Sequence, residues 1–585
     1  MAFRAWSTRA RSMAVALFDD AGERVVREVP LAPGGDGHFE ATVSGLGPGA
    51  LYQFRLDEAL LPDPYARELP FGVHGPARVI DPDAYVWRHP PRREPLSGRT
   101  VVYELHVGTF TAEGTFAAAR ARLPELAALG VTAIELMPLS SFAGRRGWGY
   151  DGVAHFAPHA AYGTPDELKA LIDEAHGLGL SVWLDVVYNH FGPEGNYLGA
   201  YSPRYFSPDA PTPWGDGPDY AGPYARRYLL DNASYWLETF RFDGLRLDAT
   251  HHVLDRGPKH VLRELAERVR ALGAPAPVLV AEDDRNDPSL MTELGLDGVW
   301  ADDAHHALHV LLTGEREGYY AGYAPHPSTL ARAIERGWLY EGQEWPPNGQ
   351  RRGSPADLLG ASQFVYTLQN HDQIGNRARG ERLHHLVSAE AYRGASALLL
   401  FLPMTPLLFM GQEWACTSPF QYFTDFPAEL GRRVSEGRRR EFEGFKAFSS
   451  AARRDAIPDP QAESTFAASV LNWGERDEAG HRETLALYTE LLQRRARDAV
   501  LGEASRARLR VGVEGGLFWV WRWGAEGGHR ALVWNVGERA VPLERPPLPA
   551  TYEWAPWLRS ERSGEPGVIG RFEAVVFAAE GPPPA

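Results

Sequence analysis

The chain has 585 residues, of which 44% are hydrophobic and 23% charged, and its formal net charge is -16. This length is too great for one hydrophobic core, so several domains are expected. The negative charge disfavours a nucleic-acid partner, because phosphate binding requires clustered basic side chains.

The cysteine count and the hydropathy pattern bear on the cellular location. Cys416 is the single cysteine, which excludes an intrachain disulfide and suits a reducing compartment. The most apolar run, residues 395–410, contains two prolines and is shorter than the roughly 20 residues that span a bilayer. Residues 1–11 carry three arginines but no apolar segment of a secretory signal. We therefore expect a soluble cytoplasmic protein with no membrane partner.

The chain opens with short alternating segments at residues 14–18, 24–29, 38–43 and 51–56, separated by Gly, Pro and Asp turns. This spacing is typical of a small β-sandwich. We place such a domain, immunoglobulin-like or carbohydrate-binding-like, at residues 1–90. The proline-rich polar stretch 62–98 resembles a linker packed along the surface.

From residue 101 onward, strands alternate with amphipathic helices. Predicted helices include 116–129, 166–178, 225–240 and 259–272. Alternation over about 400 residues predicts an α/β fold, a parallel (β/α)8 barrel across residues 91–495. The predicted strands are 101–105, 131–137, 181–187, one that begins at 244, 277–281, 299–301, 363–368 and 405–410.

Two further segments complete the predicted organisation. An insertion at about 191–222 is rich in Pro, Gly, Asp and Tyr and follows a barrel strand. We expect it to lack regular structure and to lie on the face where barrel active sites form. After residue 501, predicted strands at 508–513, 517–523, 531–536 and 572–577 indicate a C-terminal antiparallel β-domain, residues 496–585.

The stretch 244–252 carries a cation and a carboxylate on a short apolar strand. Side chains alternate along a strand, so Arg246 and Asp248 point to the same face. A structural ion pair is one interpretation of this arrangement. However, Glu282 and Asp372 also follow predicted barrel strands, as does the segment 185–190. In a barrel, these strand ends converge on one site.

These four segments resemble the four signature regions of the α-amylase family of glycoside hydrolases, and the flanking β-domains fit that family's usual modules. By this resemblance, Asp248 matches the nucleophile and Glu282 the general acid/base. Asp372 matches the third acid, which binds the sugar ring and supports the transition state.

Four more residues match positions that contact the sugar at the cleavage point. Arg246, His190 and His371 match polar contacts, and Tyr150 matches an aromatic that stacks beneath the ring. A buried structural histidine is the alternative for His190 and His371, and a purely structural aromatic is the alternative for Tyr150. For Asp185 we favour a structural hydrogen-bonding role.

The chemistry supports the same assignment. Glycosidic cleavage needs one carboxylate to attack the anomeric carbon and one carboxylic acid to protonate the leaving oxygen, roughly 5 to 5.5 Å apart in a retaining enzyme. We expect Arg246 to keep Asp248 ionised. We expect a less polar pocket to keep Glu282 protonated. Asp372 adds negative charge where an oxocarbenium-like cation develops.

Within the family, residues 300–308 resemble the DDxHH segment of the maltooligosyltrehalose trehalohydrolases, with Ala304 where an aromatic is usual. Residues 371–376, 411–414 and 420–425 are similar to the same group. The resemblance implies hydrolysis of the α-1,4 bond next to the terminal trehalose unit of a maltooligosyltrehalose. It also implies contacts with the trehalose end from Asp302, Asp303, His305, His306, His251, Gln373 and Asn376.

Several alternatives stay open. The acids and histidines of 302–306 fit a solvated loop or a metal site, but these ligands are too evenly split between neighbours to face one ion. The 191–222 insertion is short for an amylase, so we predict that no calcium and no other cofactor is required. A glycogen branching enzyme and a catalytically inactive, glucan-binding barrel are the alternative functions. We expect a monomer that acts on α-glucans.

Overall fold

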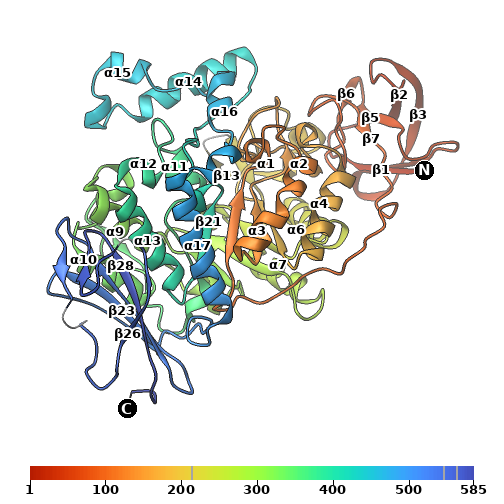
Figure 1. Ribbon diagram of the computed structural model, residues 1–585. Helices are drawn as coiled ribbons and strands as arrows, with labels where there is room; N and C mark the ends of the chain where they lie inside the picture. Colours follow the sequence, from red (N-terminus) through yellow and green to blue (C-terminus); the bar gives the residue numbers. More distant parts are fainter. Residues whose placement is uncertain (213–214, 544–546, 562–563, 585) are drawn as a thin grey trace.

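In the computed structural model, residues 1–212, 215–543, 547–561 and 564–584 are described. The chain forms an N-terminal antiparallel sheet, a central closed barrel and a C-terminal antiparallel sheet. The two sheets lie at opposite ends of the molecule with the barrel between them (Figure 1). The predicted fold class is confirmed.

The N-terminal sheet consists of β1 (Ala2–Trp6), β2 (Met13–Phe18), β3 (Val25–Pro33), β4 (His38–Thr42), β5 (Leu51–Leu56), β6 (Ala59–Leu61) and β7 (Ala77–Arg78). Its order is β1-β4-β3-β2-β5-β6, with β7 paired to β5. The start of β3 pairs with β2, and Ala32 and Pro33 at its end pair with β4. The sheet therefore curves through β3, and Phe39 from one half shares a buried core with Val15 from the other.

The barrel consists of eight parallel strands, and each strand pairs with the one that follows it in the chain. The last strand, β21, pairs with the first, β8, and so closes the barrel. Each observed strand overlaps a predicted one, because strands buried on both faces are continuous apolar runs. Their carboxyl ends share one mouth. The strands are β8 (Val102–Leu105), β9 (Ala133–Leu136), β12 (Ser181–Val186), β15 (Gly244–Leu247), β16 (Val278–Glu282), β17 (Gly298–Trp300), β20 (Phe364–Thr367) and β21 (Thr405–Phe409).

Helices cover the outside of the barrel, and local sequence signals explain their ends. Thr164 and Glu167 form a reciprocal capping box at the start of α4 (Pro165–Gly177). The single helix predicted at 116–129 is two helices, because Pro124 starts a new first turn. These two helices are α2 (Phe116–Ala121) and α3 (Leu123–Leu129). Further helices include α6 (Pro223–Ser234), α7 (Val261–Arg270), α9 (Asp302–Thr313), α10 (Pro327–Arg336), α13 (Ala389–Phe401) and α17 (Ala479–Arg497).

Two segments near the mouth differ from expectation. The 191–222 insertion was predicted to lack regular structure, and this is wrong: it contains α5 (Leu198–Tyr201), the 3-10 turn η3 (Pro203–Tyr205) and a hairpin of β13 (Phe206–Thr212) with β14 (Gly215–Pro218). A layer of helices that the sequence pattern did not predict lies over the mouth (Figure 1). It contains α14 (Ala428–Glu441), α15 (Ala451–Asp455) and α16 (Glu463–Ala468).

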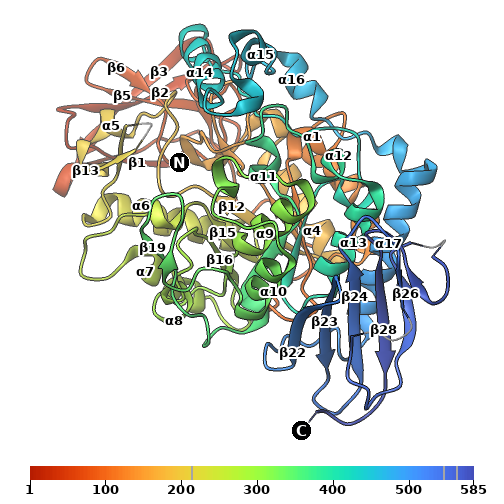
Figure 2. The same ribbon diagram turned by 90° about the vertical axis from the view of Figure 1, so that its left-hand side faces the viewer.

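The C-terminal sheet has the order β22-β23-β24-β28-β26. It packs against α13 and α10, away from the barrel mouth (Figure 2). Four of its strands match predicted ones, and β26 was not predicted. The strands are β22 (Leu509–Glu514), β23 (Leu517–Trp523), β24 (His529–Asn535), β26 (Ala555–Arg559) and β28 (Ala574–Ala579).

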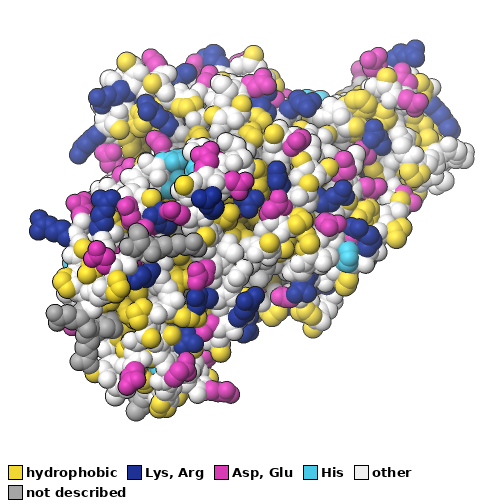
Figure 3. Space-filling view, viewed as in Figure 1, with side chains coloured by type: hydrophobic (Ala, Val, Ile, Leu, Met, Phe, Trp, Pro, Cys, Tyr) yellow, Lys and Arg dark blue, Asp and Glu magenta, His cyan; other side chains and the backbone are white. Residues whose placement is uncertain are grey.

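The surface carries both signs of charge. Acidic and basic side chains are mixed over the face seen in Figure 3, without one dominant patch of a single sign. Within the part of the chain that the structure describes, no helix combines the length and the apolar character needed to cross a membrane.

Candidate active site

The three acids predicted from the sequence lie at one mouth of the barrel. Asp248 directly follows β15, and Glu282 is the last residue of β16. Asp372 lies in the first turn of the short helix α11 (His371–Gly375), which follows β20. Strands β15 and β16 are direct neighbours in the barrel, as Figure 2 shows. The fold therefore brings together residues that lie 124 positions apart in the chain, from 248 to 372.

Arg246 links the first two acids. Its side chain is fully buried, at 0% exposure. Its Nη1 lies 2.8 Å from Asp248 Oδ1 and 2.8 Å from Asp185, and its Nη2 lies 2.8 Å from Glu282 Oε2. Trp300 covers the guanidinium at 4.2 Å from its ring centroid. A guanidinium is a rigid planar fork, so Arg246 contacts Asp248 through one terminal nitrogen and Glu282 through the other.

Asp248 is stabilised as a carboxylate. Burial alone raises its pKa, but the charge of Arg246 and a hydrogen bond from Asn189 outweigh that effect, and the net pKa lies below its usual value. Asn189 Nδ2 donates to Asp248 Oδ2 at 2.7 Å. Asp248 is therefore ionised at neutral pH, as a nucleophile must be.

Glu282 is stabilised in the opposite state. Burial raises its pKa, and the negative charges of Asp248 and Asp372 raise it further. Arg246 and a backbone N–H donated by Ala249 at 2.9 Å lower the pKa but do not reverse the shift. Glu282 is therefore protonated while Asp248 is not. Two carboxyl groups whose pKa values are pushed apart are suited to the roles of acid and nucleophile.

The third acid is the most open of the three, with 34% of the Asp372 side chain exposed. Its Oδ1 accepts a hydrogen bond from Asn376 at 3.2 Å and lies 3.5 Å from His371 Nε2. His371 is buried, and its Nδ1 lies 2.5 Å from Glu104 Oε1. Burial lowers the pKa of His371, but Glu104 and Asp372 raise it to about 9, so the ring is a cation beside Asp372.

Sequence reasoning missed Glu104, although a signal for it was present. Glu104 lies within an apolar strand and is itself fully buried, as Arg246 is in β15. It also accepts the backbone N–H of His371 at 3.2 Å. A buried carboxylate in a barrel strand needs a cationic partner, and here that partner comes from the end of β20.

Tyr150 and His190 lie beside these groups. The Tyr150 ring stacks on His371, with centroids 5.0 Å apart and an interplanar angle of 22°. Its hydroxyl donates to Asp185 Oδ2 at 2.5 Å. His190 Nε2 lies 3.0 Å from the carbonyl oxygen of Tyr150. Asp185 thus accepts from both Tyr150 and Arg246, which fits the positioning role favoured for it.

A cavity of about 840 Å³ adjoins Asp372, and Gln373 and Asn376 form part of its wall. Gln373 Nε2 donates to Asp302 Oδ1 at 3.4 Å. Burial and the nearby charge of Asp372 raise the pKa of Asp302 to about 7. These three predicted substrate-binding residues therefore lie together beside the third acid. Residues 302–306 are not a solvated loop, because they form the first turns of α9.

The predicted substrate contacts by Asp303 and His305 do not fit the structure. Asp303 is fully buried, and His305 packs beneath the surface of α9. His306 is also buried, which lowers its pKa to about 3, and it interacts with Gln373. We therefore assign these side chains to positioning α9. The groups around the Asp303 carboxylate are Asn286 Nδ2 at 2.8 Å, Tyr323 Oη at 2.5 Å, the N–H groups of Leu339 and Tyr340 at 2.7 and 3.1 Å, and Arg352 Nη2 at 3.4 Å.

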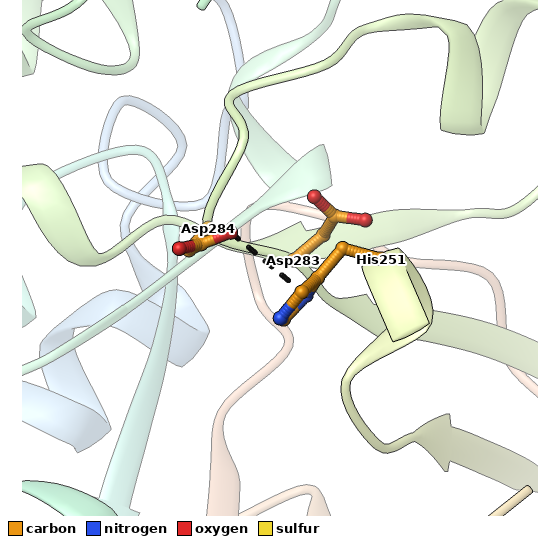
Figure 4. A group of neighbouring side chains, drawn as sticks. All are labelled: His251, Asp283 and Asp284. Carbon is orange, nitrogen blue, oxygen red and sulfur yellow. Dashed lines mark ion pairs between the residues drawn. The ribbon is translucent and has the colours of Figure 1, made fainter. Parts of the chain in front are cut away.

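His251 lies at the rim of the site. Its Nδ1 is 3.9 Å from Asp284 Oδ1, and together with Asp283 these side chains have potential ligand atoms within 4.8 Å of one another (Figure 4). However, Asp283 already accepts from Arg285 and Thr250, at 2.6 and 2.8 Å. One committed carboxylate and one mostly exposed carboxylate form a poor donor set for a metal ion.

The match with known families agrees with this geometry. The family model described as "Alpha amylase, catalytic domain" matches residues 87–205. The chain is 50% identical over 578 residues to the malto-oligosyltrehalose trehalohydrolase of Deinococcus radiodurans, with 98% of this chain and 94% of the relative covered. It is 39% identical over 532 residues to the enzyme of that name from Rhizobium sp., with 88% and 87% covered.

Two other similarities are informative. A crystal structure of a Salmonella typhimurium protein assigned as an alpha amylase superposes with a TM-score of 0.89 at 40% identity, with 99% of this chain and 97% of that chain covered. By contrast, a 1,4-alpha-glucan branching enzyme from Leifsonia xyli is 33% identical over 272 residues, which are 43% of this chain and 37% of the relative.

Proposed function

The chain belongs to the malto-oligosyltrehalose trehalohydrolase family, and from this premise we propose that it cleaves the α-1,4-glucosidic bond next to the terminal trehalose unit of a maltooligosyltrehalose, releasing trehalose. The observation that carries the proposal is the buried guanidinium of Arg246, which contacts both Asp248 and Glu282 while their pKa values shift in opposite directions.

In the first step, Glu282 donates its proton to the glycosidic oxygen while Asp248 attacks the anomeric carbon. The C–O bond breaks, trehalose leaves, and the maltooligosaccharide remains esterified to Asp248. The Arg246 guanidinium orients the attacking carboxylate, and burial of Glu282 keeps its proton available before the bond breaks. The stereochemistry is retained because a second displacement follows.

In the second step, ionised Glu282 accepts a proton from water, and the water oxygen attacks the same anomeric carbon. The ester bond to Asp248 breaks, and the shortened maltooligosaccharide leaves with both carboxyl groups restored. Asp372 stabilises the positive charge that develops on the ring in both transition states. His371 Nε2 and Tyr150 form the polar and aromatic contacts to the same sugar.

We assign trehalose-end recognition to the group beside Asp372. Asp302, Gln373 and Asn376 present oxygen and nitrogen atoms to the adjoining cavity or its edge. His251 adds a rim contact. Trehalose has no reducing end, and both its rings present only hydroxyl and ether oxygens, so a group of neutral donors and acceptors suits it. Because its pKa is about 7, the carboxyl group of Asp302 is partly protonated at neutral pH, so it can donate a hydrogen bond as well as accept one.

Comparison of two substrates tests the function. Maltotriosyltrehalose and maltopentaose are incubated with the protein in parallel, and the products are separated by chromatography. We expect trehalose and maltotriose from the first substrate and much slower turnover of the second. Comparable turnover of both would identify a general amylase, and new α-1,6 branches without trehalose would identify a branching enzyme.

We also propose that the protein acts as a monomer in the cytoplasm. Cys416 is buried and unpaired, and its thiol interacts with the carbonyl oxygen of Ser418 at 3.6 Å. No covalent link between copies can form through a thiol in that position. Light scattering at micromolar concentration checks the monomer directly, and a mass of twice 64.7 kDa would refute it.

A further inference from the structure

A second cavity, of about 410 Å³, lies where the N-terminal sheet meets the barrel. Its walls come from β1, the loop after β6, the insertion around α5 and η3, and the start of α6, which lie side by side in Figure 2. We call it the junction cavity. It shares no lining residue with the cavity beside Asp372. Its volume is within the range of about 300 to 1,000 Å³ that is common for small-ligand sites.

Aromatic rings form much of the junction cavity. Trp6 and Tyr224 stack with centroids 4.1 Å apart and an interplanar angle of 21°. Tyr205 meets Trp6 edge-on at 5.4 Å. Tyr65, which packs on Phe156 at 4.8 Å, keeps 37% of its surface exposed. Such rings offer flat apolar faces at low cost in conformational entropy, because each has only two side-chain torsions.

The polar residues of the cavity are balanced in charge. Arg4, Arg227, Asp63 and Asp231 all line it, so two positive charges accompany two negative charges. Arg227 is a surface group with 76% of its side chain exposed, and its Nε lies 3.3 Å from Asp231 Oδ2. Equal numbers of acidic and guanidinium groups disfavour a phosphate or nucleotide, which needs an excess of positive charge. They suit hydroxyl groups, which both donate and accept hydrogen bonds.

The walls are rigid before any ligand binds. The Ser7 hydroxyl donates to the carbonyl oxygen of Tyr201 at 2.7 Å, and the Thr8 N–H donates to the same oxygen at 3.2 Å. The hydroxyls of Thr8 and Ser202 lie 2.7 Å apart. Trp6 Nε1 donates to a backbone carbonyl at 2.8 Å, which fixes the orientation of its ring. Little entropy is lost when a ligand enters a site held in this way.

We propose that the junction cavity is a second carbohydrate-binding site, which holds a stretch of linear α-1,4-glucan apart from the cleavage site. Stacked rings with hydroxyl-matching polar groups are the chemistry that recognises a pyranose, whose faces are apolar and whose rim is polar. The choice of α-glucan over other sugars rests on the proposed function. Long chains would then be retained while their ends are cleaved.

Native gel electrophoresis in the presence of soluble glycogen tests the site. The wild-type chain is compared with Tyr65→Ala, Arg227→Ala and the control Phe71→Ala, which removes an exposed aromatic of the same domain outside the cavity. We expect Tyr65→Ala to weaken glycogen binding about fivefold and Arg227→Ala to weaken it about twofold. Phe71→Ala should bind as the wild type does. Thermal melting shows whether each variant is folded. The Arg227 side chain is exposed, so its removal should leave the melting temperature unchanged.

Hydrolysis of maltotriosyltrehalose is measured on the same samples and should be unchanged in all three variants. Absence of retardation of the wild-type chain, or equal retardation of the wild type and both cavity variants, would overturn the second site. A wild-type chain that binds glycogen through the cavity but releases no trehalose would overturn the proposed function and leave the second site standing. ADP in the gel should not compete, and competition by it would identify a nucleotide site instead.

Discussion

Two buried arginines, one in the barrel mouth and one beneath the C-terminal sheet, show how the same side chain serves different purposes. Arg246 is surrounded by the carboxylates of Asp185, Asp248 and Glu282. Arg522 donates only to backbone carbonyls, including that of Val500 at 3.1 Å. In the first case the charge changes the pKa values of its neighbours. In the second it satisfies carbonyl groups that would otherwise be buried without a partner.

A buried charged side chain is therefore a sign of a catalytic site only when its partners can titrate, and burial by itself is not such a sign. Carbonyl oxygens do not titrate, so Arg522 can only stabilise the packing of β23 against α13 and the chain that precedes β22. The carboxyl groups around Arg246 do titrate, and their separation into ionised and protonated states is a functional property. Variants of the two regions should therefore fail in different ways.

The largest effect is expected at the nucleophile. Asp248→Asn should reduce turnover on the order of 10⁴-fold or more, because no covalent intermediate can form. Its unfolding free energy should fall by about 1 to 3 kcal/mol, since the amide keeps the shape of the side chain but loses the charge that pairs with Arg246. Stopped assays of trehalose release and urea denaturation measure the two quantities. Activity within tenfold of the wild type would assign the role elsewhere.

Exchange of each arginine for lysine should affect catalysis in one region and stability in the other. Arg246→Lys should lower kcat about 100-fold, because one ammonium cannot contact both acids as the planar fork does. Arg522→Lys should lower the unfolding free energy by about 2 kcal/mol and leave the kcat of the folded protein unchanged. Steady-state kinetics and urea denaturation of both variants give the test. Equal losses of kcat would remove the distinction between the regions.

Neighbouring acids on α9 repeat the contrast on a smaller scale. Asp302→Asn should raise the KM for maltotriosyltrehalose about fivefold, because its carboxyl group accepts from Gln373, which lines the cavity. Asp303→Asn should leave KM within about twofold and lower the unfolding free energy by about 2 kcal/mol, since its partners are all protein groups. The reverse pattern would restore the direct contact first predicted for Asp303.

The pH dependence of stability is the one prediction that involves no change in activity. The folded pKa of His371 is about 9 and the unfolded value is 6.5, so its interactions stabilise the fold fully below pH 6.5. That contribution is lost as the pH rises through 9. Glu104→Gln removes its main partner and should reduce the difference in unfolding free energy between pH 6 and pH 10. An unchanged difference would show that His371 does not titrate there.

Much of the barrel could be predicted because parallel strands are buried on both faces and so form continuous apolar runs. Acids at or soon after the ends of such runs are expected to meet at the mouth, which is why Asp248, Glu282 and Asp372 could be placed at one site before any coordinates. Their separate roles were predicted from the resemblance to the α-amylase family. Glu104 was missed because it lies within its strand rather than after it, and because its partner His371 is 267 residues away in the chain.

Other features depend on tertiary contacts that no local pattern contains. The β13–β14 hairpin has proline and aspartate where strands usually have branched residues, so its pairing was not predicted. The burial of Asp303 is decided by Tyr323, Leu339 and Tyr340, which follow in later segments. An adjacent pair of acids on a helix points in two directions, and the sequence alone does not say which one faces the cavity.

The central claim is that Asp248 attacks while Glu282 holds a proton. Peptide mass spectrometry of Glu282→Gln, quenched after incubation with α-maltotriosyl fluoride, tests this most directly. Fluoride leaves without protonation, and the variant lacks the base that activates water, so the intermediate should accumulate. We predict that the peptide containing Asp248 gains one maltotriosyl group. A label on any other residue, or no label while the fluoride is consumed, would contradict the account.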